Sequence, residues 1–341
     1  MPDVNCSYPL TRQGIKYRPT LQAMDPIIPP SLSTGDTIAI VPTARAINVA
    51  ELKDGIALVE SWGLRVKLGA GIGKKHFQQA GTAQERSMDL QAALDDPDVK
   101  AIWCARGGYG TVHLLEHLDL SNIRKDPKWV IGFSDITVLH SALHNLGVAS
   151  LHAQMPFNIA AKTEASRTTL RDVLFRKVYD VSYQMSTNFE TKEQLATRLH
   201  RPGQCEGVIV GGNLSLLYAL RGTPYDIDPR GKILFLEDLD ELYYHLDRMV
   251  MNLKLAGWFK DLAGLMIGGM TDMRNKDEND PFGKTAGQII SEAIGEARYP
   301  VCFNFPAGHV ADNRALLFGK KAKLSVTPED ATLSFEGSAV L

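Results

Sequence analysis

The sequence has few cysteines, and their spacing excludes a cysteine metal site. Only four occur among 341 residues, Cys6, Cys104, Cys205 and Cys302, and no C-x-x-C pair is present. Cys104 and Cys302 lie in apolar runs, where a free thiol behaves as a small buried hydrophobic group. We therefore expect a reduced, cytoplasmic protein without disulfides or a cysteine zinc site.

Long apolar runs and a strong charge of either sign are also missing. No window approaches the roughly 18 consecutive apolar residues of a membrane span. The opening stretch, "MPDVNCSYPLTRQGIKYRP", lacks the apolar core of a signal peptide. The formal net charge of -2 gives no indication of nucleic-acid or anionic-membrane binding. We expect no nucleic-acid partner and no membrane partner.

Strand-like and helix-like segments alternate from about residue 37. Short β-branched runs at 36–42, 99–105 and 128–133 alternate with amphipathic segments such as 48–63. This rhythm predicts an α/β fold, with a parallel-sheet N-terminal domain covered by helices on both faces. A second set of apolar runs after residue 200 predicts a smaller mixed α/β C-terminal domain.

The length favours two domains, at roughly 100–200 residues each. A Pro-rich, aperiodic arm precedes the first set of runs, and a polar stretch separates the two sets. We predict an N-terminal arm over 1–34, an N-terminal α/β domain over 35–165, an interdomain crossover over 166–200 and a C-terminal α/β domain over 201–341.

A glycine-rich turn, "CARGGYGT" (104–111), directly follows the third predicted strand. Gly107, Gly108 and Gly110 can take positive φ and bring backbone N–H groups close to a ligand. Before an apparent helix over 112–118, such a turn is suited to an anion or an oxyanion. The alternative is a tight turn without a ligand. The G-x-G-x-x-G and Walker A nucleotide motifs do not fit the sequence.

A single serine joins an apolar run to an amphipathic one in "WVIGFSDIT" (129–137). Ser134 would lie at the carboxyl end of a strand, which is where ligands bind in α/β proteins. With Gly132 before it, the turn resembles the G-x-S-x-G nucleophile elbow, although Ile136 replaces the second glycine. The alternative is that Ser134 is a helix N-cap.

A base and an acid are available in the second half of the sequence. His309 follows a Pro-Ala-Gly turn and could act as a general base from a loop. Glu237 is the first charge after an apolar run, so it is well placed to point into a cleft. The acids that follow, Asp238, Asp240 and Glu241, are expected to lie at a helix start and complement its dipole.

Two histidine pairs could suggest a metal. "HLLEH" matches the inverted zinc motif H-x-x-E-H, with His113 and His117 on one face of a helix and Glu116 as a base. His140 and His144 form a second i, i+4 pair without a glutamate. Short matches of this kind are often accidental, and we expect no metal.

Taken together, these segments resemble the LD-carboxypeptidases, a family of serine peptidases that includes the murein tetrapeptide carboxypeptidases and the microcin C immunity peptidases. The resemblance runs from about residue 35 to 325. The segments that carry it, in order, are "ARGGYG", "IGFSDIT", "GGNLSLL", "LFLEDLDE" and "GHVADNRALLFG". The order and spacing of these segments are more specific than any one of them.

The resemblance implies a Ser-His-Glu triad, with Ser134 as nucleophile, Glu237 as acid and His309 as base. The serine would belong to the first domain and the other two residues to the second, which predicts a site at the domain interface. Such an enzyme needs no cofactor. Since family members are commonly homodimers, a homodimer is expected.

Further roles follow from acyl-transfer chemistry. The backbone N–H groups of Asp135 and Gly108 are the predicted oxyanion donors. Arg106 is the candidate for holding a terminal carboxylate, with Gly107 and Tyr109 beside it as substrate-binding residues. The alternative for Arg106 is a structural salt bridge.

The predicted activity is that of a serine carboxypeptidase that releases terminal D-alanine from murein tetrapeptide, a small peptide, during peptidoglycan recycling. One alternative is the microcin C type of immunity peptidase, which hydrolyses aminoacyl-nucleotide amides. Alternatives of another kind are a non-catalytic module that binds a ligand at the glycine turn and a zinc hydrolase built on "HLLEH".

Overall fold

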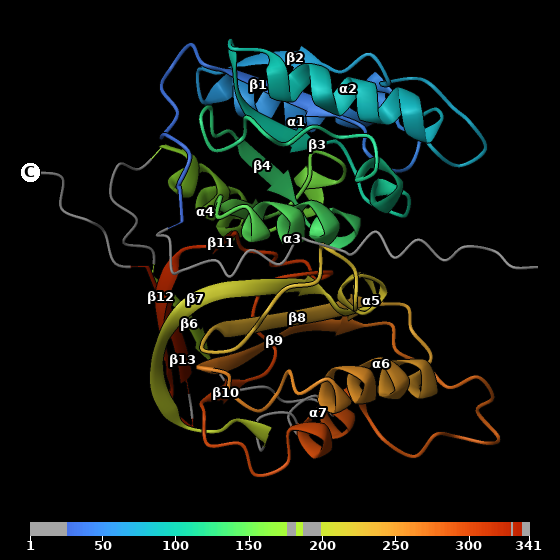
Figure 1. The fold of residues 1–341 in the computed structure, drawn as a ribbon, viewed down its shortest axis with the longest axis vertical. Coiled ribbons are helices and arrows are strands. Elements are labelled where there is room, and N and C mark those ends of the chain that lie inside the picture. The colour runs from blue at the N-terminus through green and yellow to red at the C-terminus, as the bar shows by residue number, and fades with distance from the viewer. Residues whose placement is uncertain (1–25, 176–181, 187–198, 329, 336–341) are drawn as a thin grey trace, which may run out of the picture.

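Figure 1 shows the computed structural model, which describes residues 26–175, 182–186, 199–328 and 330–335. Two sheets with their helices form the two halves of the molecule, stacked along its longest axis. The predicted fold class, a mostly parallel α/β N-terminal unit followed by a mixed α/β unit, is confirmed. Most of the predicted N-terminal arm, residues 1–25, lies outside the described residues.

The first sheet has six strands in the described chain, in the order β11-β5-β4-β3-β1-β2. The strands are β1 (Thr37–Val41), β2 (Arg65–Leu68), β3 (Val99–Cys104), β4 (Trp129–Gly132), β5 (Ser150–His152) and β11 (Leu316–Phe318). Every neighbouring pair is parallel except β11 and β5. Since β11 comes from the C-terminal part of the sequence, both halves of the chain contribute to this sheet.

Helices cover both faces of the first sheet. They are α1 (Val49–Ser61), α2 (Ala83–Asp95), α3 (Thr137–Asn145) and α4 (Glu164–Phe175). Asn48 and Thr82 begin α1 and α2 as capping boxes, which satisfy backbone N–H groups that the first turn leaves free. Along β1, Ile38 packs in the cluster that contains α1 and α4, and Ala39 in the cluster that contains α2 and α3. Both faces are therefore buried.

The second sheet has seven strands in the described chain, in the order β10-β9-β8-β7-β12-β13-β6. The strands are β6 (Ser182–Ser186), β7 (Gly203–Asn213), β8 (Ile233–Leu239), β9 (Gly264–Thr271), β10 (Val301–Cys302), β12 (Lys321–Val326) and β13 (Asp330–Ser334). Strands β7 to β10 are parallel, whereas β12, β13 and β6 are antiparallel. Its helices are α5 (Leu214–Ala219), α6 (Tyr243–Leu255) and α7 (Ala286–Ile294).

The two halves meet where β7 ends against α3. The backbone N–H of Asn213, the last residue of β7, donates a hydrogen bond to Thr137 Oγ1 at 2.9 Å. Gly212 is needed at this contact, because a Cβ on it would lie 2.5 Å from Thr137 Oγ1. This junction brings the segment after β4, which carries the candidate nucleophile, close to β8, which carries the candidate acid.

The local structure differs from expectation at one helix. The segment expected to be helical over 112–118 contains only a 3₁₀ turn, η1 (Thr111–Leu114). The backbone N–H groups of His113, Leu115 and His117 donate to carbonyl oxygens three residues earlier, which is 3₁₀ and not α-helical hydrogen bonding. Parts of the predicted crossover, residues 176–181 and 187–198, lie outside the described residues. No helix in the described ranges is long and apolar enough to cross a membrane.

Candidate active site

The candidate nucleophile lies on a strained turn at the end of β4. Ser134 has φ of 63°, in the left-handed region that non-glycine residues rarely adopt. Its hydroxyl caps no helix, because neither η2 (Ser134–Ile136) nor α3 has a side-chain cap. The helix-cap alternative is therefore wrong, and the turn has the character of a nucleophile elbow.

The strand end beneath this elbow is fixed by packing and by a buried histidine. A Cβ on Gly132 would lie 2.7 Å from the Ile136 side chain, which explains why Gly132 is needed although the second motif glycine is missing. His140 Nε2 lies 2.9 Å from the Gly132 carbonyl oxygen, and Nδ1 lies 2.8 Å from Ser150 Oγ. Burial lowers the pKa of His140 to about 4, so the ring is neutral. His140 thus supports the elbow, a role that its pairing with His144 in the sequence did not suggest.

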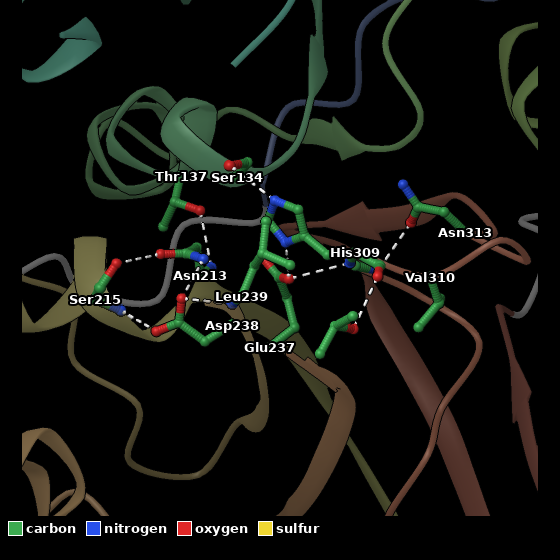
Figure 2. A network of polar contacts seen from close by, with 12 residues as sticks. Ser134, Thr137, Asn213, Ser215, Glu237, Asp238, Leu239, His309, Val310 and Asn313 are labelled. Atoms are coloured by element: carbon green, nitrogen blue, oxygen red, sulfur yellow. Dashed lines mark hydrogen bonds and ion pairs between the residues drawn. The ribbon is translucent and has the colours of Figure 1, made fainter. Parts of the chain in front are cut away.

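The structure brings the three predicted triad residues together (Figure 2). His309 Nε2 lies 3.1 Å from Ser134 Oγ, and His309 Nδ1 lies 2.6 Å from Glu237 Oε2. Glu237 is fully buried in β8, and His309 comes from the loop between β10 and β11. Gly308 must be glycine, because a Cβ on it would lie 2.7 Å from Glu237 Oε2. These contacts form a continuous path from hydroxyl to imidazole to carboxylate.

The electrostatics of this path favour a charged imidazole. Burial by itself lowers the pKa of His309, but the Glu237 carboxylate, with a smaller contribution from Asp238, outweighs burial and raises the pKa above 6.5. Glu237 Oε2 also accepts a hydrogen bond from the His309 backbone N–H at 3.3 Å. One carboxylate oxygen therefore fixes both the ring and the backbone of His309.

A second buried carboxylate, that of Asp238, lies next to Glu237 in the sequence. Asp238 Oδ1 accepts a hydrogen bond from Asn213 Nδ2 at 2.9 Å, and Oδ2 accepts from the Ser215 backbone N–H at 2.9 Å (Figure 2). Burial, together with the neighbouring Glu237, raises the pKa of Asp238 to about 7. Asn213 also donates its backbone N–H to Thr137, so this network connects the acid strand with α3.

The expected helix-start role of the three acids after Glu237 is wrong. α6 begins only at Tyr243 and has no acid in its first turn. Asp238 is buried within β8, and Glu241 Oε2 lies 2.6 Å from His245 Nδ1. Asp240 forms an ion pair on the loop before the helix. β8 continues two residues beyond Glu237, to Leu239. The sequence did not predict this extension, because the residues change from apolar to acidic at Glu237.

The glycine-rich loop lies against the nucleophile. A Cβ on Gly107 would lie 3.3 Å from Ser134 Oγ, and Gly108 has φ of 119°. The fully buried Asp135 connects the elbow with this loop, because its Oδ2 accepts the Thr111 backbone N–H at 2.8 Å. The sequence analysis predicted a role only for the Asp135 backbone N–H, as an oxyanion donor. In the structure, the Asp135 carboxylate also holds the glycine-rich loop.

Another buried residue holds the far end of the loop. The Arg86 guanidinium, which is 2% exposed, donates to the carbonyl oxygen of Gly110 at 2.9 Å and to that of Thr43. Nothing in the helical pattern around Arg86 distinguished it from a surface arginine. The loop conformation therefore depends on a guanidinium from α2 and a carboxylate from the elbow.

The predicted substrate-binding side chains lie beside the loop. The Arg106 guanidinium lies 4.1 Å from the centre of the Phe157 ring, and Nη1 lies 3.8 Å from Glu51 Oε1. That distance exceeds a hydrogen bond, but it is an ion pair, and Arg106 Nη1 also donates to the Ala46 carbonyl oxygen at 3.4 Å, so the structure is compatible with the salt-bridge alternative as well as with substrate binding. Arg106 lines a cavity of about 480 Å³. Tyr109 is half exposed, and its ring packs edge-on against His113.

The zinc motif lacks the helix that it requires. In "HLLEH", His113 lies in the 3₁₀ turn η1, and Glu116 and His117 follow it outside any α-helix. Within the part of the chain that the structure describes, no group of three or more His, Cys, Asp or Glu side chains could hold a metal ion. This segment does not form the helical face that the inverted zinc motif uses.

Comparison with known proteins places both halves of the chain in one family. Residues 38–153 match the LD-carboxypeptidase N-terminal domain, and residues 206–324 match the LD-carboxypeptidase C-terminal domain. A probable murein peptide carboxypeptidase of Bacillus subtilis (strain 168) is 36% identical, over 89% of this chain and 93% of that protein. The murein tetrapeptide carboxypeptidase of Pseudomonas aeruginosa PAO1 is 31% identical, over 84% of this chain and 92% of that protein.

A solved structure shares the fold. The structure of MccF in complex with glutamyl sulfamoyl guanosine has a TM-score of 0.77 and covers 92% of this chain and 99% of its own. The two sequences are 20% identical, so this likeness concerns the fold alone.

Proposed function

Because this chain belongs to the LD-carboxypeptidase family, we propose that it is a serine carboxypeptidase that releases terminal D-alanine from murein tetrapeptide. The observation that carries the proposal is the path from Ser134 through His309 to Glu237, with contacts of 3.1 and 2.6 Å. Relatives named murein peptide and murein tetrapeptide carboxypeptidases support the substrate class.

The proposed reaction is an acyl transfer in two stages. His309 takes the proton of the Ser134 hydroxyl as the oxygen attacks the scissile carbonyl carbon, and then gives that proton to the nitrogen of the leaving D-alanine. Water then attacks the acyl-enzyme with His309 again as base, which frees the tripeptide and restores Ser134. Glu237 holds the imidazole with Nε2 toward the serine and stabilises the imidazolium.

The oxyanion of each tetrahedral intermediate needs donors next to Ser134. We assign this function to the backbone N–H groups of Asp135 and Gly108, one from the elbow and one from the glycine-rich loop. Loss of one such donor typically costs about 10²–10³ in rate. Arg106, Gly107 and Tyr109 are assigned to substrate binding, with the terminal carboxylate on Arg106.

The proposal includes a cytoplasmic homodimer that works in peptidoglycan recycling. Support for a reducing compartment comes from Cys104 and Cys302, which are buried free thiols. Sedimentation velocity on the purified chain tests the dimer, since a monomer at micromolar concentration contradicts it.

The direct test is incubation with murein tetrapeptide, followed by mass spectrometry for tripeptide and D-alanine. We expect turnover by the wild-type protein and none by Ser134→Ala. Ser141→Ala is the matched control, because Ser141 is a buried serine of α3 outside the triad. Turnover retained in Ser134→Ala would refute the nucleophile.

The same assay separates the alternatives. If the protein hydrolyses aminoacyl-nucleotide amides in preference to tetrapeptide, the triad assignment stands but the proposed substrate is wrong. A serine-reactive fluorophosphonate that labels wild-type protein but not Ser134→Ala supports an enzyme. Failure to label either protein, with ligand binding unchanged in His309→Ala, would indicate a non-catalytic binding module.

A further inference from the structure

A cavity of about 480 Å³ lies at the same edge of the first sheet as Ser134. Its lining includes Arg45, which follows β1, Arg106, which follows β3, and Lys74 and Lys75, which follow β2. Because the strand order is β4-β3-β1 and neighbouring strands are about 4.8 Å apart, β1 lies roughly 10 Å from the strand that carries Ser134. We call this cavity the cationic pocket.

The positive charges of the cationic pocket exceed the negative ones. Lys74 pairs at 3.1 Å with Glu85, and Arg106 lies 3.8 Å from Glu51, the acid in the lining. In the described ranges, Arg45 and Lys75 have no acidic partner. Burial and then the nearby Arg45 lower the pKa of Arg106. Cations that face one cavity without matching acids attract an anion.

The glycine-rich loop contacts both the nucleophile and a residue of the cationic pocket. Gly107 lies against Ser134 Oγ, and a Cβ on Gly108 would collide with the Arg45 side chain. The aliphatic part of Arg45 therefore runs across Gly108, and the same residue lines the pocket. The loop therefore links the cationic pocket to the site of a carbonyl bound at Ser134.

An exposed aromatic residue at the rim is held under strain. Phe77 lines the pocket, is 83% exposed and has φ of 54°. A bulky residue in the left-handed region is strained, and such strain clusters at active sites, ligand clamps and switch regions. Phe77 offers an apolar surface next to the four cations.

We propose that the cationic pocket is an anion subsite that binds a carboxylate of the peptide substrate, with Arg45 and Lys75 as its main ligands. The inference rests on the proposed function, because it concerns the substrate of the same site. A murein tetrapeptide carries one carboxylate at its leaving end and others on its acyl side. The pocket could bind either kind of carboxylate, because both have the same charge and shape, and substrate analogues distinguish the two.

The test measures binding without turnover, in a Ser134→Ala background, by isothermal titration with murein tetrapeptide. Arg45→Met with Lys75→Met removes both charges and keeps the aliphatic part of Arg45 that packs on Gly108. We expect Kd to rise roughly tenfold, the sum of two partly exposed ion pairs. The control Lys53→Met removes a lysine of α1 outside the lining and should leave Kd within about twofold.

Two analogues identify the carboxylate. One has a C-terminal amide, and the other has lysine and isoglutamine in place of the acyl-side diaminopimelate and D-glutamate. The double variant should lose its effect on the analogue that lacks the bound carboxylate. An unchanged Kd for tetrapeptide, or an equal loss of affinity for all three peptides, would overturn the subsite.

Wild-type turnover of tetrapeptide is measured in parallel. If turnover is present and Kd is unchanged, only the subsite fails, and if turnover is absent, the proposed function fails.

Discussion

The N-terminal half presents Ser134 at the partly exposed end of a parallel sheet, whereas the C-terminal half supplies Glu237 from the buried, acidic end of β8 and His309 from the loop between β10 and β11. On the first side, the glycine-rich loop lies against the candidate nucleophile, and four cations line a cavity beside that loop. On the second, Glu237 and Asp238 are adjacent buried carboxylates. The comparison shows a division of functions, in which one half is suited to stabilise negative charge and the other to hold a proton.

The largest effect is expected from the acidic half. Glu237→Gln should lower kcat by about 10³–10⁴-fold, because the amide cannot stabilise the imidazolium and can hold the wrong tautomer of His309. Steady-state kinetics with murein tetrapeptide measure the loss. Glu241→Gln, which alters a carboxylate that contacts His245 instead, should change kcat less than about twofold. A loss below tenfold in Glu237→Gln would contradict this role.

A smaller loss of activity is expected from the N-terminal half, where the Asp135 carboxylate holds the glycine-rich loop. Asp135→Ala leaves the Thr111 N–H without its buried acceptor, so kcat should fall roughly tenfold to a hundredfold as the oxyanion donors lose their placement. The free energy of unfolding should fall by about 1–3 kcal/mol. Asp135→Asn keeps an acceptor and should recover most of kcat. Equal kinetics for the two variants would exclude this explanation.

The junction between the halves should contribute less. Thr137→Val removes the acceptor of the Asn213 N–H and should lower the free energy of unfolding by about 1–2 kcal/mol in urea titrations. Thr137→Ser keeps the hydroxyl and serves as the control. If Thr137→Val is as stable as wild type, this hydrogen bond does not fix the two halves.

The smallest effect concerns pH. The base must be neutral, and the pKa of His309 is raised, so kcat/KM should fall as pH drops through a value above 6.5. Asp238 helps to raise that pKa, and its own pKa of about 7 means that its charge appears in the same range. Asp238→Asn should therefore move the acidic limb to lower pH, by roughly half a unit or less. A shift to higher pH would contradict the assignment.

Much of the arrangement was predictable from local patterns. The strands at 36–42, 99–105 and 128–133 were recognised because a strand buried on both faces reads as a short, continuous apolar run. The three residues of the candidate triad were predicted by resemblance of spaced motifs. Local sequence alone was compatible with Ser134 as a helix N-cap or as a nucleophile. Its positive φ and its contact with His309 argue against the N-cap.

Other parts could not be predicted because they depend on partners distant in sequence. His140 contacts Gly132, Arg86 contacts Gly110, and Asp238 contacts Asn213, and none of these pairs has a recognisable motif. The prediction of an α-helix over 112–118 was wrong, because apolar periodicity does not distinguish 3₁₀ from α-helical hydrogen bonding.

The sequence by itself determined the α/β alternation, the apolar faces and the chemical groups available, because these depend on short-range periodicity and residue type. Only the tertiary structure decided the contacts of His309 with Ser134 and Glu237, the hydrogen bond from the Thr111 N–H to the buried Asp135 carboxylate, and the gathering of four cations in one pocket. The reason is physical: burial and the distances between atoms arise when strands from both halves of the chain pack, and no local pattern encodes either quantity.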